Sequence, residues 1–476
     1  MENLEPKEVI KHFLEISKIP RESGNEKEIS DFLVKFAKER GLEVIQDKAM
    51  NVIIKKPGTK AYENSSPVII QGHMDMVCEK TPESKHDFLT DPIEVIHDGD
   101  YLKAKDTTLG ADNGIAVAMA MAILDSKELE HPPIEVLITS AEETGMDGAL
   151  AVDGTNFKGK TLLNIDTDNE GVFIVSCAGG ANVESTFKGN KIPFNGEAIK
   201  ISISNYSGGH SGVEIHKQKG NAISHLGRLI YALSEAGEFY ISTINGGSKH
   251  NAIALSSDAI ISVRDSEKAI EILEGVKKNL LSELVISDPD AEITFEKIES
   301  PADMYDEKLS KELATFLFLM PQGVQGISLA IDNLVETSLN QGVLRDLNGT
   351  ITLETSVRGS QRSAQNYLIE KLISLTKLCG GEAIRASDYP AWEYELNSKV
   401  REKAVSVYKR LYGEEPEVNA IHAGLECGIL KGALPDCDMI SFGPTQLDAH
   451  TYHERVSISS LERVWNFTKE LLKELK

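Results

Sequence analysis

The chain has 476 residues, which is more than one hydrophobic core usually organises, so we expect two or three domains. Its 74 Asp and Glu residues outnumber its 50 Lys and Arg residues, giving a formal net charge of -24. Such a charge repels nucleic acids and anionic membranes, and no stretch approaches the roughly 20 apolar residues of a membrane span. We therefore expect a globular protein with neither nucleic-acid nor membrane partners.

The cysteines favour a reducing compartment. There are five, an odd number, and none forms a C-x-x-C pair, which fits reduced thiols better than a disulfide framework. The first residues show no basic region followed by an apolar run, so we expect no secretory signal. Together these observations predict a cytoplasmic protein.

The first part of the chain alternates helical and strand-like patterns. Apolar residues recur at helical spacing in residues 6–17, and a second amphipathic stretch covers residues 26–40. Short apolar runs then indicate buried strands, at residues 52–54, 68–70, 134–138 and 162–165. This alternation predicts an α/β fold class, with a mostly parallel sheet and helices on both of its faces.

The pattern changes after Gly180 and returns near Tyr389. The middle part shows alternating strands and intervening helices, for example at residues 198–204, 259–263 and 221–233. A helix, a strand and a terminal helix then resume the first pattern, at residues 398–412, 439–442 and 459–475. We therefore expect a discontinuous α/β domain of residues 1–183 and 387–476, and an inserted α+β domain of residues 184–386.

Acidic and histidine side chains follow three of the predicted strands, and these are His73 and Asp75, Glu142 and Glu143, and Asp166. Open α/β sheets bind ligands in the crevice outside the carboxyl ends of their strands, so the three strand ends point to one place. Imidazole nitrogens and carboxylate oxygens are ligands that divalent metals accept. The pattern predicts a hydrolase with two metals.

Each of these residues also has an ordinary structural interpretation. Asp112 lies in G-A-D-N-G just before the helical run 115–124, where it could simply cap the helix. Paired glutamates in an acidic protein are usually solvated surface, although Glu142 and Glu143 follow a buried strand. A histidine such as His73 is often paired with backbone, but Asp75 two residues on favours the functional interpretation.

Taken with three further motifs, these residues resemble the co-catalytic di-zinc metallopeptidases, a family that includes aminoacylases, carboxypeptidases and dipeptidases. The motifs, in chain order, are H-x-D (His73, Asp75), G-A-D-N-G (110–114), Glu142 with Glu143, Asp166, G-G-H-S-G (208–212) and H-x-x-x-E (His450, Glu454). Within the family, residues 422–428 and 443–445 are similar to aminoacyl-histidine dipeptidases, which cleave Xaa-His dipeptides. The resemblance covers nearly the whole chain.

The resemblance implies two divalent metal ions, zinc first, with cobalt and manganese also accepted by such ligands. It makes His73 and Asp166 ligands of one metal. Glu143 and His450 are then ligands of the other, and Asp112 is the carboxylate that bridges both.

Two histidines could be the last metal ligand, because His453 lies three residues after His450. The family pattern places a glutamate four residues after the ligand, and Glu454 therefore selects His450. His453 and Tyr452 depart from the residues that the family usually has at these positions.

The resemblance also implies the catalytic roles. Glu142 is expected to be the general base that takes a proton from a water bridging the metals. Adjacent residues in an extended chain point apart, which would let Glu143 bind metal while Glu142 faces this water. Asp75 is expected to bond His73 and fix its tautomer.

The inserted domain is implied to act as a lid that closes over the substrate. His210 is its candidate donor to the oxyanion, although a glycine-rich loop with an exposed histidine is common. Asn251 and Arg358 resemble substrate-binding positions, and Arg358 suits a dipeptide carboxylate. Gly424 and Glu426 resemble the part of the family that binds the C-terminal residue of the substrate. Helix capping or packing is the alternative for Glu426.

The sequence therefore predicts a cytoplasmic metal-dependent dipeptidase for Xaa-His and other small dipeptides. Dimerisation through the lid is a family-level expectation. The alternatives are a tripeptidase or an N-acyl amino acid deacylase of the same family, or a catalytically silent protein that binds metal or peptide. Retention of Glu142 beside a complete ligand set argues against the silent protein, since a binding protein needs no base.

Overall fold

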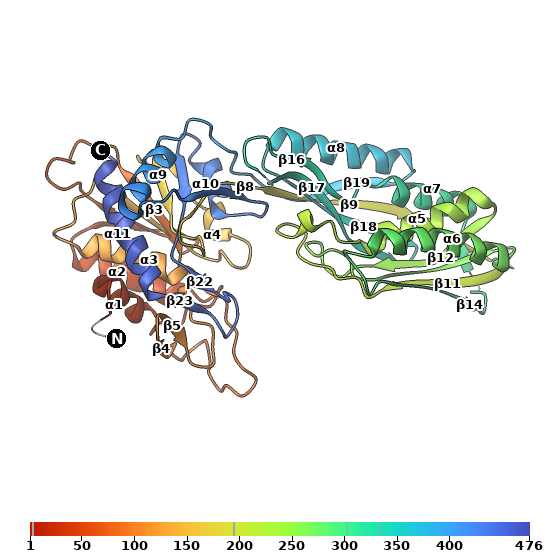
Figure 1. The fold of residues 1–476 in the computed structure, drawn as a ribbon, viewed down its shortest axis with the longest axis horizontal. Coiled ribbons are helices and arrows are strands. Elements are labelled where there is room, and N and C mark those ends of the chain that lie inside the picture. Colours follow the sequence, from red (N-terminus) through yellow and green to blue (C-terminus); the bar gives the residue numbers. More distant parts are fainter. Residues whose placement is uncertain (2–3, 194–195, 302, 333) are drawn as a thin grey trace. The chain divides into compact units, whose positions relative to one another are not determined.

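The computed structural model describes residues 1, 4–193, 196–301, 303–332 and 334–476 (Figure 1). Two compact units make up the chain. Unit 1 comprises Met1–Ser176, Tyr394–Ala420 and Leu425–Lys476, and unit 2 comprises Cys177–Glu393 and Ile421–Gly424. Within the described ranges, no helix has both the length and the apolar character that crossing a membrane requires.

An eight-stranded sheet forms the centre of unit 1, in the order β1-β2-β6-β3-β7-β21-β8-β20. These strands are β1 (Glu43–Gln46), β2 (Val52–Lys56), β6 (Ile134–Thr139), β3 (Val68–His73), β7 (Thr161–Asn164), β21 (Asp438–Ser441), β8 (Val172–Cys177) and β20 (Glu417–Ile421). The sheet is mixed, because β6, β3, β7 and β21 are parallel neighbours whereas β1, β2 and β8 pair antiparallel. Strands β6, β3 and β7 therefore end at the same edge.

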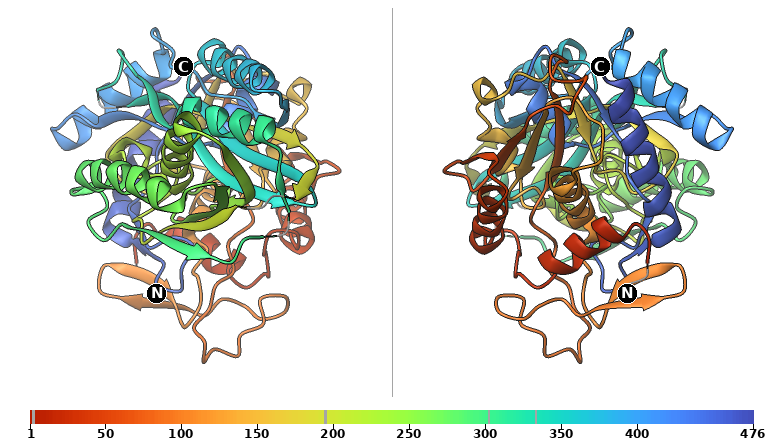
Figure 2. Two further views of the ribbon diagram at one scale, coloured as in Figure 1. Left: turned by 90° about the vertical axis from the view of Figure 1, so that its right-hand side faces the viewer. Right: turned by 90° about the vertical axis from the view of Figure 1, so that its left-hand side faces the viewer.

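Central strands must be apolar on both faces, and β3 and β6 are buried along their whole length. The helices of unit 1 are α1 (Lys7–Ile16), α2 (Lys27–Glu39), α3 (Ala111–Asp125), α4 (Asp147–Leu150), α9 (Lys399–Tyr412), α10 (Glu426–Ala433) and α11 (Ile458–Glu474). Helix α3 is apolar almost all round because it is enclosed, with β3 on one side and α1 on another. In the right-hand view of Figure 2, α11 runs in dark blue along unit 1.

A small antiparallel sheet in unit 1 has the order β22-β23-β5-β4. Its strands are β22 (Gln446–Leu447), β23 (Arg455–Ser457), β5 (Tyr101–Ala104) and β4 (Val95–Asp98). Strands β22 and β23 pair with each other, so residues 448–454 form the loop between them. His450 is carried by this loop.

Unit 2 is built on a nine-stranded antiparallel sheet in the order β14-β11-β13-β12-β17-β18-β9-β19, with β16 also paired to β17. Its strands are β9 (Gly179–Lys188), β11 (Glu197–Ser204), β12 (Phe239–Gly246), β13 (Ser257–Val263), β14 (Glu292–Ile298), β16 (Gly323–Ile327), β17 (Val335–Leu347), β18 (Thr350–Gly359) and β19 (Glu382–Tyr389), and a further pair is β10 (Lys191–Pro193) with β15 (Asp303–Tyr305). The helices are α5 (Ala222–Ala236), α6 (Ser266–Leu284), α7 (Glu307–Leu319) and α8 (Arg362–Leu378). One face of the sheet and the apolar stripes of these helices share a single core.

Candidate active site

The residues at the strand ends of unit 1 converge on Asp112, the second residue of α3, where the backbone is still non-helical. His73, the last residue of β3, places Nε2 3.1 Å from Asp112 Oδ1 and 3.7 Å from Asp166 Oδ1. His450 Nε2 lies 3.0 Å from the other Asp112 oxygen, Oδ2, and 3.1 Å from Glu143 Oε2. Asp112 therefore offers one oxygen to each of two imidazole groups, as a bridging ligand must.

The donor set fits divalent metals. Ligand atoms of His73, Asp112 and Glu143 all lie within 4.8 Å of one another. Glu143 Oε1 is buried and has no hydrogen-bond partner among the described residues. A buried carboxylate oxygen without a partner is costly, and a cation would satisfy it. Imidazole with carboxylate ligands is a combination that zinc accepts.

The electrostatic field at the site also favours positive charge. Hydrogen bonds to Asp112 and Glu143 raise the pKa of His450 to about 11. The carboxylates that stabilise a proton on this ring would equally stabilise a metal ion in its place. His453, the alternative to His450 as the last ligand, is exposed, and its ring packs against Tyr452 at a centroid separation of 4.4 Å. The structure thus brings His450 to Asp112.

Glu454 holds the loop that carries Asp112. Its buried carboxylate accepts hydrogen bonds from the backbone N–H groups of four consecutive residues, Leu109 (2.7 Å), Gly110 (2.9 Å), Ala111 (2.7 Å) and Asp112 (3.2 Å). Those of Ala111 and Asp112 are among the N–H groups that the start of a helix leaves without partners. The glutamate of H-x-x-x-E therefore holds the backbone that carries Asp112.

Arg21 connects the same loop to the end of β3. Its guanidinium is buried and donates from Nη1 to the carbonyl of Met74 (3.0 Å) and from Nη2 to that of Gly110 (2.5 Å). No sequence motif points to Arg21, because residues 20–24 lack metal-ligand spacing and the contact depends on the fold.

Asp75 connects His73 to the Glu142–Glu143 segment. Its Oδ1 lies 3.3 Å from His73 Nδ1 and accepts from the backbone N–H of Glu142 at 3.1 Å. Its Oδ2 accepts from the N–H of Glu143 (3.2 Å) and from Ser23 Oγ (2.7 Å), another residue that the sequence did not point to. Asp75 is thus placed to orient both the imidazole and the paired glutamates.

The paired glutamates lie in a turn, and the expectation of an extended chain at this point is wrong. Backbone φ of Ala141 is 51°, so the chain leaves the strand direction directly before Glu142. Burial, together with the carboxylates of Glu426 and Glu143, raises the pKa of Glu142 to about 8. A carboxyl group with such a pKa can take up and return a proton near neutral pH.

Predicted substrate-binding residues of unit 2 lie near Gly212 and Ser211. Gly212 is the point of contact, since a Cβ added there would lie 2.9 Å from His210 Cε1, 3.2 Å from Arg358 Nε and 2.6 Å from the carbonyl oxygen of His422. Asn251 accepts from the N–H of Ser211 through its backbone carbonyl at 2.9 Å. Gly424 ends the segment Ile421–Gly424 of the same unit.

Two side chains of this cluster keep groups available for a ligand. His210 Nδ1 accepts from the N–H groups of Gly212 and Val213, both at 3.2 Å, so its proton is on Nε2. Burial and the nearby Arg358 lower the pKa of His210, which keeps the ring neutral. Arg358 donates from Nη1 to Tyr389 (2.8 Å), while its buried Nε has no partner among the described residues.

His422 is a residue of this cluster to which the sequence assigned no role. Its Nε2 lies 2.7 Å from Ser338 Oγ, and burial lowers the pKa of the ring to about 3. Glu426, by contrast, belongs to unit 1 and is 1% exposed at the start of α10. A substrate contact for Glu426 stays a prediction, and its enclosure by protein argues against it.

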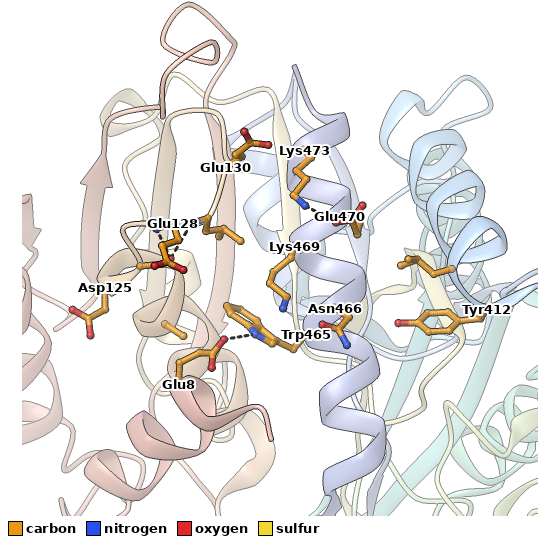
Figure 3. Close-up of a pocket in the computed structure, with 14 residues that line it drawn as sticks. Glu8, Asp125, Glu128, Glu130, Tyr412, Trp465, Asn466, Lys469, Glu470 and Lys473 are labelled. Carbon is orange, nitrogen blue, oxygen red and sulfur yellow. Dashed lines mark hydrogen bonds and ion pairs between the residues drawn. The ribbon is translucent and has the colours of Figure 1, made fainter. Parts of the chain in front are cut away.

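A large pocket of unit 1 lies away from these residues. Its volume is about 910 Å³, and its lining comes from α1, the end of α3 and the loop after it, α9 and α11. Figure 3 shows the carboxylate of Glu8 directed at the indole of Trp465, whose Nε1 donates to it at 2.8 Å. None of the predicted site residues lines this pocket. Pocket size alone would therefore misplace the site.

Residues 69–474 match the Peptidase family M20/M25/M40. The chain belongs to this family. It is 36% identical to the cytosol non-specific dipeptidase of Escherichia coli (strain K12) over an alignment of 482 positions that covers 100% of this chain and 99% of the relative. The M20 membership confirms the family expected from the motifs.

Solved structures agree with this assignment. The aminoacylhistidine dipeptidase from Vibrio alginolyticus superposes on this M20 chain with a TM-score of 0.94 at 34% identity, covering 99% of this chain and 97% of that one. The aminopeptidase PepT from Bacillus cereus shares the fold, with a TM-score of 0.61 at 18% identity and 99% coverage of both chains. The predicted α/β fold class is confirmed.

Proposed function

We propose that this M20 peptidase is a cytoplasmic metallo-dipeptidase that hydrolyses Xaa-His and other small dipeptides with two divalent ions, zinc first. One observation carries the proposal: the two oxygens of Asp112 lie 3.1 and 3.0 Å from two imidazole nitrogens at the edge where three strands end. The names of the two similar dipeptidases, each covering almost the whole chain, support the substrate class.

The ligands divide into two sets around Asp112. His73 with Asp166 would hold one ion, and His450 with Glu143 the other. Two such ions would lower the pKa of a water molecule shared between them and polarise the carbonyl of the peptide bond. The chain itself supplies the remaining steps.

Glu142 is the proton carrier in this proposal. It takes the proton of the attacking water and gives it to the nitrogen of the leaving amine. Asp75 keeps this carboxyl group in place, since it bonds the backbone N–H of both Glu142 and Glu143. The raised pKa of Glu142 fits a group that alternates between the two protonation states.

Unit 2 supplies the groups that hold the substrate. The Nε2–H of His210 is a neutral donor suited to the developing oxyanion. The guanidinium of Arg358 suits the carboxylate of a dipeptide, and its buried Nε has no hydrogen-bond partner in the part of the chain that the structure describes. Asn251 and Gly424 remain predicted substrate contacts, and the inserted unit remains the predicted lid.

Association between copies through unit 2 is part of the proposal. Several large apolar side chains of this unit are highly exposed, among them Leu329, Ile286 and Leu378 at 103%, 91% and 85%. These side chains belong to different segments and are exposed singly, which is ordinary for a protein surface, so this part of the proposal rests on the family resemblance. Light scattering on a gel-filtration column would report the mass directly, and a monomer would remove this part of the proposal.

A substrate panel tests the activity and separates the rivals. The zinc-loaded protein is offered the same Xaa-His sequence as a free dipeptide, as an N-acetylated dipeptide and with one residue added. We expect the free dipeptide to be cleaved fastest. Preference for the acetylated form would identify a deacylase, preference for the longer peptide a tripeptidase, and binding without cleavage of any of them a silent binding protein.

A further inference from the structure

A buried polar layer lies beneath the candidate metal ligands. It consists of Gln71 in β3, Thr139 in β6 and Asn164 in β7, each at most 1% exposed. Gln71 and Asn164 stand two residues before the candidate ligands of their strands, and Thr139 ends the strand that leads to the paired glutamates. Most of the other positions of these strands are apolar, so buried polar side chains are uncommon here.

Glu426 joins this layer from the first turn of α10. Its Oε2 accepts from Gln71 Nε2 at 2.6 Å and from Thr139 Oγ1 at 2.9 Å. Gln71 Oε1 in turn accepts from Asn164 Nδ2 at 2.5 Å, between residues that face each other in the parallel pairing of β3 and β7. One carboxylate therefore connects the ends of three neighbouring strands.

Stability does not account for the carboxylate. Glu426 is 1% exposed, and its Oε1 has no hydrogen-bond partner among the described residues. A buried carboxylate that lacks a paired cation costs folding free energy, whereas an apolar side chain of similar volume would usually not.

We propose that Glu426 is a positioning residue of the metal centre, which holds the ends of β6, β3 and β7 in the register that the metal ligands require. Through Gln71 it fixes the end of β3 before His73, and through the bond from Gln71 to Asn164 it fixes the segment before Asp166. The inference rests on the proposed metal site, but assigns Glu426 a role beneath the ligands in place of a contact with substrate.

The chain offers a matched control. Glu135 also belongs to β6, is 3% exposed, and accepts hydrogen bonds from the N–H groups of Lys158 and Gly159 at 3.0 and 2.9 Å. Glu135→Gln and Glu426→Gln therefore make the same chemical change to a buried, hydrogen-bonded carboxylate. Only the second touches the polar layer.

The test measures zinc affinity of the metal-stripped full chain by competition with a chromophoric chelator, and then kcat and KM of the reloaded protein on a Xaa-His dipeptide. For Glu426→Gln we expect zinc affinity and kcat to fall about 10- to 100-fold, as for other groups that orient metal ligands, with KM within about twofold of wild type. Glu135→Gln should keep both within about twofold of wild type.

Three outcomes would overturn the inference. Wild-type zinc affinity and kcat in Glu426→Gln would remove the positioning role, and a raised KM alone would indicate a substrate contact. Equal losses in both variants would indicate general destabilisation. If wild type itself binds no zinc, the proposed function fails instead.

A second variant is used if Glu426→Gln does not fold. Thr139→Val removes one hydrogen-bond donor to Glu426 while keeping the shape of the side chain. Zinc affinity should also fall in this variant, and unchanged affinity would contradict the inference.

Discussion

Asp112 and His450 show what single residues contribute to this site. Asp112 is held by backbone hydrogen bonds to Glu454, whereas His450 is carried by the exposed loop between β22 and β23. The ring of His450 nevertheless reaches both Asp112 and Glu143 within 3.1 Å. The loop between β22 and β23 therefore adds His450 to the candidate metal site, although this loop is not part of the eight-stranded sheet.

The choice between two histidines gives a prediction. His450→Ala removes a proposed metal ligand and should lower kcat/KM by more than about 100-fold, exceeding the usual effect of losing a group that merely orients a ligand. His453→Ala should stay within about twofold, since the ring of His453 faces solvent and Tyr452. Steady-state kinetics on one dipeptide checks both variants. A larger loss in His453→Ala would reverse the assignment.

The role of Glu142 gives a second prediction at this scale. Glu142→Gln keeps the shape of the side chain but removes the proton carrier, so kcat should fall by about 100- to 10,000-fold. Zinc content, measured by atomic absorption, should remain that of wild type, because Glu142 is not assigned to a metal. Unchanged turnover would contradict the mechanism, and loss of zinc would make Glu142 a ligand.

At the scale of helices and strands, periodicity in the sequence predicted the elements well. The helix expected at residues 398–412 is α9, and Ser398 caps it by accepting from the N–H of Arg401. The apolar runs at 68–70 and 134–138 are the parallel strands β3 and β6. Amphipathic and apolar patterns are local, so the sequence carries them directly.

Features that depend on contacts between distant segments could not be predicted. Nothing around Arg21 indicates that its guanidinium will bridge residues 74 and 110. Likewise, Gln71 and Glu426 are 355 positions apart, and their hydrogen bond exists only because α10 packs beside the central strands. The turn at Ala141 was missed because a single residue with positive φ leaves no periodic signal.

Helix α5 of unit 2 carries a pH-dependent contribution to stability. Burial, and then the charge of Arg228, lower the pKa of His225 to about 4, and the ring accepts or donates a 2.8 Å hydrogen bond with Tyr206. An unfolded histidine titrates near 6.5. Between these values the unfolded chain binds more protons than the folded one, so stability falls as the pH drops from about 6.5 towards 4.

The measurement is the free energy of unfolding in urea at pH 7 and pH 5. This histidine should contribute a loss of about 2 kcal/mol between the two pH values. In His225→Asn that part of the pH dependence should disappear, while the part due to other groups, such as His422, remains. Equal pH dependence in both proteins would show that His225 is protonated in the folded state.

For the whole molecule, the ligands are contributed by segments from residue 73 to residue 450, so the site forms only when unit 1 is folded around its sheet. Unit 2 contains a separate cluster of His210, Arg358 and His422 that fits a carboxylate and an oxyanion. Under the proposed function, the metal chemistry would belong to unit 1 and the binding of substrate to unit 2. The chain requires both units for the proposed reaction.

The most direct test of this account is release of free histidine from a Xaa-His dipeptide by protein stripped of metal with a chelator, before and after zinc is added back. We predict no turnover in the stripped protein and recovery as zinc binding approaches two ions per chain. Turnover that persists without metal, or no turnover with both ions bound, would contradict the claim that Asp112 organises a two-metal dipeptidase site.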